Sequence, residues 1–184
     1  MRALPRNSDV EPERVPDDLW AKADRIKGYL TREEANLLWR YCKAPWCEIG
    51  TFCGRSAAVL SGRGSGWCVD LFEDWYAGES CTNLGAITKI RALRGDFRDV
   101  AHLVPDGLEF LYLDADHSYE ATLAAFWAYE PKVKVGGHIA LHDALELHPG
   151  QMDWPGTNSA MATLVREAYY LVAASHRVVV FQKQ

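Results

Sequence analysis

The stretch Glu48-Ile-Gly-Thr-Phe-Cys-Gly-Arg-Ser56 decides the fold, because a short apolar run ends there in two glycines and a helical segment begins. Gly50 and Gly54 permit a tight turn and let a ligand approach the backbone. The free amides at the start of the following helix can then meet a polar or anionic group. On this stretch alone, the glycines could equally serve only to fit the chain between a strand and a helix.

Outward from this turn, short apolar runs alternate with helical stretches, which indicates an α/β fold with a mostly parallel sheet. Only residues 174–177 separate the last two runs, too few for the dozen or more of a parallel crossover, so we expect an antiparallel hairpin there. The seven predicted strands are Trp46–Gly50, Trp67–Phe72, Arg91–Asp96, Glu109–Asp114, Gly137–His142, Tyr169–Ala173 and Val178–Lys183. Helices are predicted on both faces, near Arg55–Ser61, Thr82–Ile90, Arg98–Leu103 and Ser118–Tyr129, and from Asn158 or Ser159 to about Glu167.

The N-terminal part of the chain differs from the rest. Residues 1–16 carry three prolines among charged residues and predict a flexible arm. Residues 17–45 hold two amphipathic segments, predicted to be helices that pack on the domain formed by residues 46–184. The second, Thr31–Cys42, opens with Thr31 and Glu34 in the arrangement of a capping box.

Composition excludes several classes of protein. A chain of 184 residues predicts one domain, and its net charge of -5 gives no basic field for nucleic acid. No apolar run approaches the roughly 20 residues that span a bilayer, and the N-terminus lacks an apolar signal core, so we expect a cytoplasmic protein with no membrane partner. The five cysteines contain no C-x-x-C pair, which favours reduced and mostly buried thiols.

The spacing of the glycines narrows the ligand class. It matches neither G-x-G-x-x-G nor a phosphate loop, which disfavours a pyrophosphate ligand. Asp70 ends the next predicted strand, about twenty residues beyond the turn, where a carboxylate can accept hydrogen bonds from both ribose hydroxyls. A nucleoside without a phosphate chain therefore fits. Asp70 could instead be a strand-end acid or a helix cap, and Glu73 and Asp74 are competing acids.

A second cluster follows the fourth and fifth predicted strands, at Asp114-Ala-Asp116-His117 and His142-Asp143. If those strands are neighbours, both groups emerge at the sheet edge that carries the glycine turn. Carboxylates with histidines can bind a hard divalent cation or supply a general base. Asp116 could instead cap the following helix, and His117 could be an exposed loop residue.

Together with Asp70, three segments carry a family resemblance: Glu48–Ser56, Leu113–Tyr119 and Gly136–Asp143. Roughly from Trp46 onward, the chain resembles class I S-adenosylmethionine-dependent methyltransferases. It looks most like the small-molecule O-methyltransferases related to catechol O-methyltransferase and the group of cephalosporin hydroxylase. The resemblance implies a Rossmann-like domain whose cofactor-binding residues are Glu48, Gly50, Thr51, Phe52, Gly54, Ser56, Asp70, Leu71, Asp96, Phe97 and Asp114.

The resemblance also implies a role for the acidic cluster. Asp114 and Asp143 match the carboxylates that hold Mg²⁺ in the metal-dependent members, and His117 occupies the loop position of their lysine base. The chain departs from that pattern because His142 and Ala144 flank Asp143. His142 could complete a metal site and favour Mn²⁺, Fe²⁺ or Zn²⁺, or His117 could remove the substrate proton without a metal. Asp114, His117 and Asp143 are thus the expected catalytic residues.

The long connection Leu145–Gly156 is a candidate lid, and Trp75, Tyr76 and Trp154 could line the substrate pocket or simply pack the domain. The leading hypothesis is a methyltransferase acting on a hydroxyl of a small-molecule acceptor. One alternative is a metal-dependent hydrolase of a phosphoester-type substrate. Another is a non-catalytic module that binds the cofactor or a protein partner. The N-terminal helices could cover the sheet or the second subunit of a homodimer.

Overall fold

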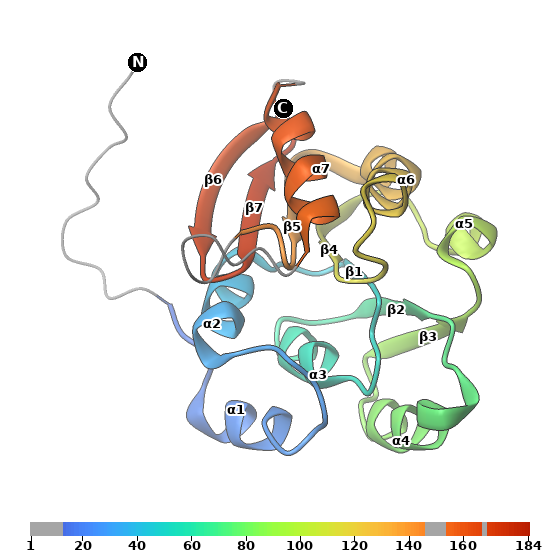
Figure 1. Cartoon of the computed structure of the whole chain (residues 1–184). Helices are drawn as coiled ribbons and strands as arrows, with labels where there is room; N and C mark the ends of the chain where they lie inside the picture. The colour runs from blue at the N-terminus through green and yellow to red at the C-terminus, as the bar shows by residue number, and fades with distance from the viewer. Residues whose placement is uncertain (1–12, 146–153, 167–168) are drawn as a thin grey trace.

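The computed structural model describes residues 13–145, 154–166 and 169–184 (Figure 1). Its centre is a seven-stranded sheet in the order β3-β2-β1-β4-β5-β7-β6. β7 runs antiparallel to both of its neighbours, and the other adjacent pairs are parallel, which confirms the predicted hairpin. The strands are β1 Trp46–Ile49, β2 Gly66–Asp70, β3 Ile90–Arg94, β4 Leu108–Leu113, β5 Val133–Leu141, β6 Tyr170–Ser175 and β7 Val178–Gln182.

Helices cover both faces of the sheet (Figure 1), as the alternating pattern predicts. Along β4, Phe110 and Tyr112 join one core while Leu111 and Leu113 join the other, because successive side chains of a strand point to opposite faces. The first core contains side chains of α1 Asp17–Ala23, α2 Arg32–Tyr41, α3 Arg55–Ser61 and α4 Asp74–Gly85. The second contains those of α5 Phe97–Val100, α6 Tyr119–Tyr129 and α7 Pro155–Arg166.

The register of the parallel strands brings their carboxyl ends to one edge. Ile49 of β1 pairs with Leu113 of β4, and Leu113 pairs with Leu141 of β5. The next residues continue this alignment, since the amide of Asp114 donates to the Ile49 carbonyl and that of His142 to the Leu113 carbonyl. The glycine turn, the acidic cluster and the His142-Asp143 pair therefore lie side by side.

The N-terminal helices pack on α3 and on the β6–β7 end of the sheet. α2 begins at Arg32 with the predicted capping box, in which Thr31 and Glu34 satisfy each other's amides. Arg55, the first residue of α3, holds the connection between α1 and α2 by donating to the carbonyls of Asp24, Ile26 and Leu30. The residue before α1 is Pro16, and most of the predicted N-terminal arm lies outside the described residues.

Three predicted elements were placed wrongly. The helix predicted at Thr82–Ile90 is α4, which begins at Asp74 because Trp75 and Tyr76 pack against Phe52 instead of extending as a loop. α7 begins at Pro155, a residue whose fixed φ suits a first helical position. Asn158 therefore does not cap it, and its side chain donates to the Ala144 carbonyl.

The third misplaced element is β5, which was predicted to begin at Gly137 and begins at Val133. The apolar pattern did not reveal those four residues, because Lys134, Val135 and Gly136 are exposed. Val133 nevertheless pairs with Leu108 of β4, and the register shifts before the pairing of Phe110 with His138.

The five cysteines are free thiols, four of them buried and Cys81 exposed, as the sequence predicts. Among the described residues, no helix combines the length and apolar character needed to cross a membrane.

Candidate active site

In the glycine turn after β1, the position of Gly50 tolerates no other residue. Gly50 has a φ of +91°, and a Cβ there would lie 2.1 Å from the Asp114 carbonyl oxygen. The turn therefore packs directly against the chain that leaves β4. Gly54, with a φ of +97°, is the N-cap of α3, and Ser56 follows in the first turn of that helix.

Glu48 stands behind this turn as a buried acid. Its side chain is fully buried, and neither carboxylate oxygen makes a hydrogen bond with any described residue. Burial raises the pKa of Glu48 to about 8, against the opposing effect of the nearby Ser56 and Thr51 hydroxyls. A buried acid without a hydrogen-bond partner is costly to ionise, which is the physical reason for this shift.

Asp70 follows the same edge at the end of β2. Its Oδ2 accepts from the amide of Phe52 at 2.8 Å, and its Oδ1 accepts from the amide of Phe72 at 2.8 Å and from the Tyr76 hydroxyl. A carboxylate offers about four acceptor positions, so the remaining position belongs to Oδ2. Asp70 can therefore accept one hydroxyl directly, and a second requires the Tyr76 hydroxyl to move.

A cavity of about 350 Å³ opens between the ends of β1, β2 and β3. Four residues that the sequence analysis assigns to the cofactor line it: Asp70, Leu71, Asp96 and Phe97. Asp96 also caps α5 by accepting from the Arg98 amide. The cofactor residues predicted at three strand ends thus border one space.

A larger cavity of about 710 Å³ lies beside it. Four residues, Gly50, Phe52, Trp75 and Asp114, line both cavities, so the two spaces meet at the glycine turn. The remaining walls of the larger cavity come from distant segments. They are Lys27, Gly28, Tyr29, Leu30, Thr51, Arg55, Ser56, His117, His142, Asp143, Trp154 and Arg177.

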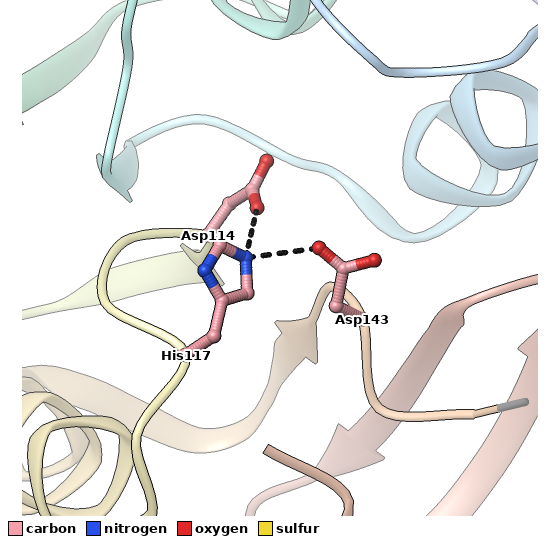
Figure 2. A group of neighbouring side chains, drawn as sticks. All are labelled: Asp114, His117 and Asp143. Atoms are coloured by element: carbon pink, nitrogen blue, oxygen red, sulfur yellow. Dashed lines mark ion pairs between the residues drawn. The ribbon is translucent and has the colours of Figure 1, made fainter. Parts of the chain in front are cut away.

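Three predicted catalytic residues converge in the wall of the larger cavity. Figure 2 shows His117 on the loop after β4, with its Nε2 facing Asp114 and Asp143. That nitrogen lies 2.9 Å from Oδ2 of Asp143 and 3.9 Å from Oδ1 of Asp114. Asp143 has a φ of 51°, outside the usual range for a residue other than glycine. The fold therefore holds Asp143 in a strained backbone conformation that places it against His117.

The three residues also form a donor set for a cation. Each of Asp114, His117 and Asp143 offers a ligand atom, and these atoms lie within 4.8 Å of one another. Two carboxylates and an imidazole suit a divalent ion such as Mg²⁺ or Mn²⁺. His142, the third ligand that the sequence suggested, is not part of this group, although its Nδ1 lies 3.4 Å from Asp114 and 3.0 Å from Asp143.

Behind the cluster lies a buried ion-pair network. Nδ1 of His142 lies 3.0 Å from Asp143, and its Nε2 lies 3.5 Å from Glu34 of α2. Nη1 of Arg177, in the β6–β7 turn, lies 3.1 Å from Oδ1 of Asp143, and its Nε lies 3.5 Å from Glu34. Both oxygens of Asp143 are therefore engaged, and α2 is connected to the site.

The network explains the charge states at the site. Burial acts against ionisation, yet Asp114, Asp143 and Glu34 raise the pKa of His142 to about 10. Burial by itself would raise the pKa of Glu34, but the interactions with His142 and Thr31 lower it to about 2. The pKa of Asp143 is also lowered, by His117, His142 and Arg177, against the effect of burial. For Asp114, burial raises the pKa.

Sequence reasoning missed Glu34 and Arg177 as parts of the site. Glu34 was assigned only to a capping box, and Arg177 only to a hairpin turn. The two residues are 143 positions apart, and no local pattern links them. Only their opposite charges could have suggested that the two residues form a pair.

Trp154 closes the site from the side of α7. Its ring stacks on that of His117 at a centroid distance of 4.2 Å, and Gly156 packs against the backbone of the same loop. The candidate lid Leu145–Gly156 is described only at its two ends, and its central residues 146–153 lie outside the described residues.

A family model described as a methyltransferase domain matches residues 47–144, more than half of the chain. Solved structures share the fold at low identity. A methyltransferase from Podospora anserina bound to S-adenosylhomocysteine is 11% identical, with a TM-score of 0.70 over 100% of this chain and 99% of that one. An O-methyltransferase from Streptomyces achromogenes, involved in tomaymycin synthesis and in complex with S-adenosylmethionine, is 14% identical, with a TM-score of 0.66 over 92% and 91%.

A third structure contains a metal. A methyltransferase from the mycinamycin biosynthetic pathway, in complex with Mg, S-adenosylhomocysteine and mycinamycin VI, is 20% identical. Its TM-score is 0.63 over 93% of this chain and 55% of that one.

Proposed function

The chain belongs to the methyltransferase-domain family, and from this premise we propose that it transfers a methyl group from S-adenosylmethionine to a hydroxyl of a small molecule. Similar folds that bind S-adenosylmethionine or S-adenosylhomocysteine support the cofactor. A hydroxyl acceptor is favoured by two of the similar structures. One is an O-methyltransferase, and the other is a methyltransferase in complex with a small molecule.

The smaller cavity suits the nucleoside end of the cofactor. Asp70 offers one free acceptor position to a ribose hydroxyl, and Asp96 and Phe97 border the space beyond it. The methionine part would then pass Gly50, where the absence of a side chain leaves room beside the backbone. This course leads from the smaller cavity into the larger one, where Thr51 and Ser56 contribute to the wall.

The larger cavity suits the acceptor. The oxygen of its hydroxyl forms a bond to the methyl carbon while the carbon–sulfur bond breaks and leaves its electron pair on sulfur. The products are the methyl ether and S-adenosylhomocysteine. With Nε2 of His117 donating to Asp143, Nδ1 takes the hydroxyl proton, and Asp143 stabilises the imidazolium that forms. Asp114 lies at the junction, where a negative carboxylate favours the positively charged sulfonium.

One observation carries this assignment: Nε2 of His117 lies 2.9 Å from Asp143 in a cavity that shares Gly50 and Asp114 with the proposed nucleoside site. A base oriented by a carboxylate next to the transferring group is what deprotonation requires.

The donor set Asp114, His117 and Asp143 also fits a divalent cation, which would lower the pKa of the acceptor hydroxyl when bound. Oδ1 of Asp143 is already engaged by Arg177, so Oδ2 would be the atom available to an ion. In the structure, Nε2 of His117 already contacts Oδ2 of Asp143, the oxygen that an ion would need. We therefore favour His117, rather than a metal ion, as the group that activates the hydroxyl.

The experiment is methyl transfer from isotopically labelled S-adenosylmethionine to a panel of phenols, sugars and polyketide alcohols, read by mass spectrometry. It is run with a chelator and again with Mg²⁺ or Mn²⁺. Labelled methyl ethers that form in both conditions support His117 as the base. Turnover only with added metal would assign that role to the cation. The absence of transfer, together with the absence of cofactor binding, would overturn the proposed function.

A further inference from the structure

Besides His142, which is held between carboxylates, one lysine and two arginines line the larger cavity, and both arginines already have partners. Arg55 donates to the carbonyls of three residues between α1 and α2, and also lies 3.5 Å from an oxygen of Asp24. Arg177 is paired with Asp143 and Glu34. Neither guanidinium is therefore free to bind a ligand without breaking contacts that hold the cavity together.

Lys27, the third, has a different environment. It is exposed, and no carboxylate of any described residue lies within ion-pair distance of it. Its Nζ lies 5.5 Å from the ring centroid of Phe52 and 5.1 Å from that of Trp75. The two rings keep the ammonium at the cavity mouth by cation–π attraction, without neutralising its charge.

The position of Lys27 relates it to the glycine turn. Phe52 and Trp75 line both cavities, so the ammonium lies beside the junction through which the methionine part of the cofactor would pass. Arg55 fixes the backbone on both sides of Lys27 through Ile26 and Leu30. The charge is thus held at a defined place over the turn.

The charges around the junction favour one orientation of an amino-acid tail. Asp114 lines both cavities at the junction, where it attracts an ammonium group and repels a carboxylate, whereas the charge of Asp143 is already balanced by Arg177 and His142. Lys27 provides the opposite charge at the mouth. A tail with both groups would therefore direct its carboxylate to the mouth.

We propose that Lys27 binds the carboxylate of the methionine part of S-adenosylmethionine, an inference that rests on the proposed function. This assigns a cofactor contact to the connection between α1 and α2, outside the matched family segment at residues 47–144. It also gives the N-terminal helices a role in binding the cofactor.

The test compares S-adenosylmethionine with decarboxylated S-adenosylmethionine, which differs only in lacking that carboxylate, by titration calorimetry. The Lys27→Gln variant should bind S-adenosylmethionine roughly 10-fold more weakly than the wild type, because a charge-assisted contact is lost. It should bind the decarboxylated compound as the wild type does, and Lys27→Arg should retain most of the affinity. Lys89→Gln, which removes an exposed lysine before β3 at the opposite edge of the sheet, is the charge-matched control.

Equal affinity of Lys27→Gln and wild type for S-adenosylmethionine would overturn the inference while leaving the proposed function intact. An equal loss of affinity for both compounds would also overturn it, because the carboxylate would then make no difference. If the wild type binds neither compound, the proposed function fails, and this inference fails with it.

Discussion

The two cavities that meet at Gly50 are built in different ways. The smaller one is lined almost entirely by residues at the ends of β1, β2, β3 and β4 and by those that follow each strand. The larger one adds side chains from the α1–α2 connection, the loop before α7 and the β6–β7 turn. The register of the parallel strands thus places most of the proposed nucleoside site, whereas the proposed acceptor site depends on packing between distant segments.

The largest effect should come from breaking the residue that both cavities share. Gly50→Ala places a Cβ 2.1 Å from the Asp114 carbonyl oxygen at a φ of +91°, so the turn and the chain after β4 cannot both keep their positions. We expect loss of cofactor binding and destabilisation by roughly 3 kcal/mol or more. Thermal unfolding and calorimetry measure both effects.

Gly78→Ala is the matched control, because nothing lies within 4 Å of its Cβ and the residue is inside α4. It should leave binding unchanged and stabilise the fold by up to about 1 kcal/mol. Unimpaired binding by Gly50→Ala would contradict the described junction.

The next effect should separate the two cavities. His117→Ala removes the proposed base from the larger cavity. His117 does not line the smaller cavity, and among the residues that do, it is connected only to Asp114, 3.9 Å from its Nε2, and to its chain neighbour Asp116. Turnover should fall by roughly 10²- to 10⁴-fold, while the Kd for S-adenosylhomocysteine stays nearly constant. Kinetics with an identified acceptor, together with calorimetry, measure the separation. His102→Ala, at an exposed histidine that lines neither cavity, should change neither quantity, and full activity of His117→Ala would refute its role.

These two cavities also differ in how much the sequence could predict. Gly50, Asp70 and Asp96 each stand where an apolar run ends, and parallel strands bring such ends to one edge, so their proximity followed from the pattern. Asp114 and Asp143 followed in the same way.

Lys27, Glu34 and Arg177 could not be assigned to the site, because their positions depend on how the N-terminal helices pack on α3 and β6. The start of α4 was missed for a related reason: Trp75 and Tyr76 become helical by packing against Phe52, a tertiary contact that local pattern does not contain.

A smaller effect should come from the packing that closes the larger cavity. Arg177→Met removes one of the two cationic partners that Asp143 and Glu34 share and leaves only His142, and we expect a loss of about 3 kcal/mol in the free energy of unfolding. Denaturant unfolding measures it. Arg94→Met, which breaks an exposed ion pair with Asp74, should cost less than about 1 kcal/mol. Equal losses in the two variants would show that the network does not support the site.

The smallest effect concerns the charge state of Glu48, the buried acid behind the glycine turn. The pKa of Glu48 is raised from 4.5 to about 8, so between these values the folded state keeps a proton that the unfolded state has released. The contribution of Glu48 to stability is therefore fully present below pH 4.5 and is lost as the pH rises through 8. Glu48→Gln removes this dependence. It should be more stable than the wild type by at least about 1 kcal/mol at pH 8, with a smaller difference at pH 5. Parallel profiles of Tm against pH would contradict this.

Calorimetric titration of S-adenosylhomocysteine into the wild type and Asp70→Asn tests whether the strand-end edge binds the cofactor. We expect one site per chain in the wild type. Binding should be at least roughly 10-fold weaker in Asp70→Asn, because the amide loses the charge that accepts a ribose hydroxyl. No binding by a folded wild-type protein, or equal affinity of the two proteins, would contradict this expectation.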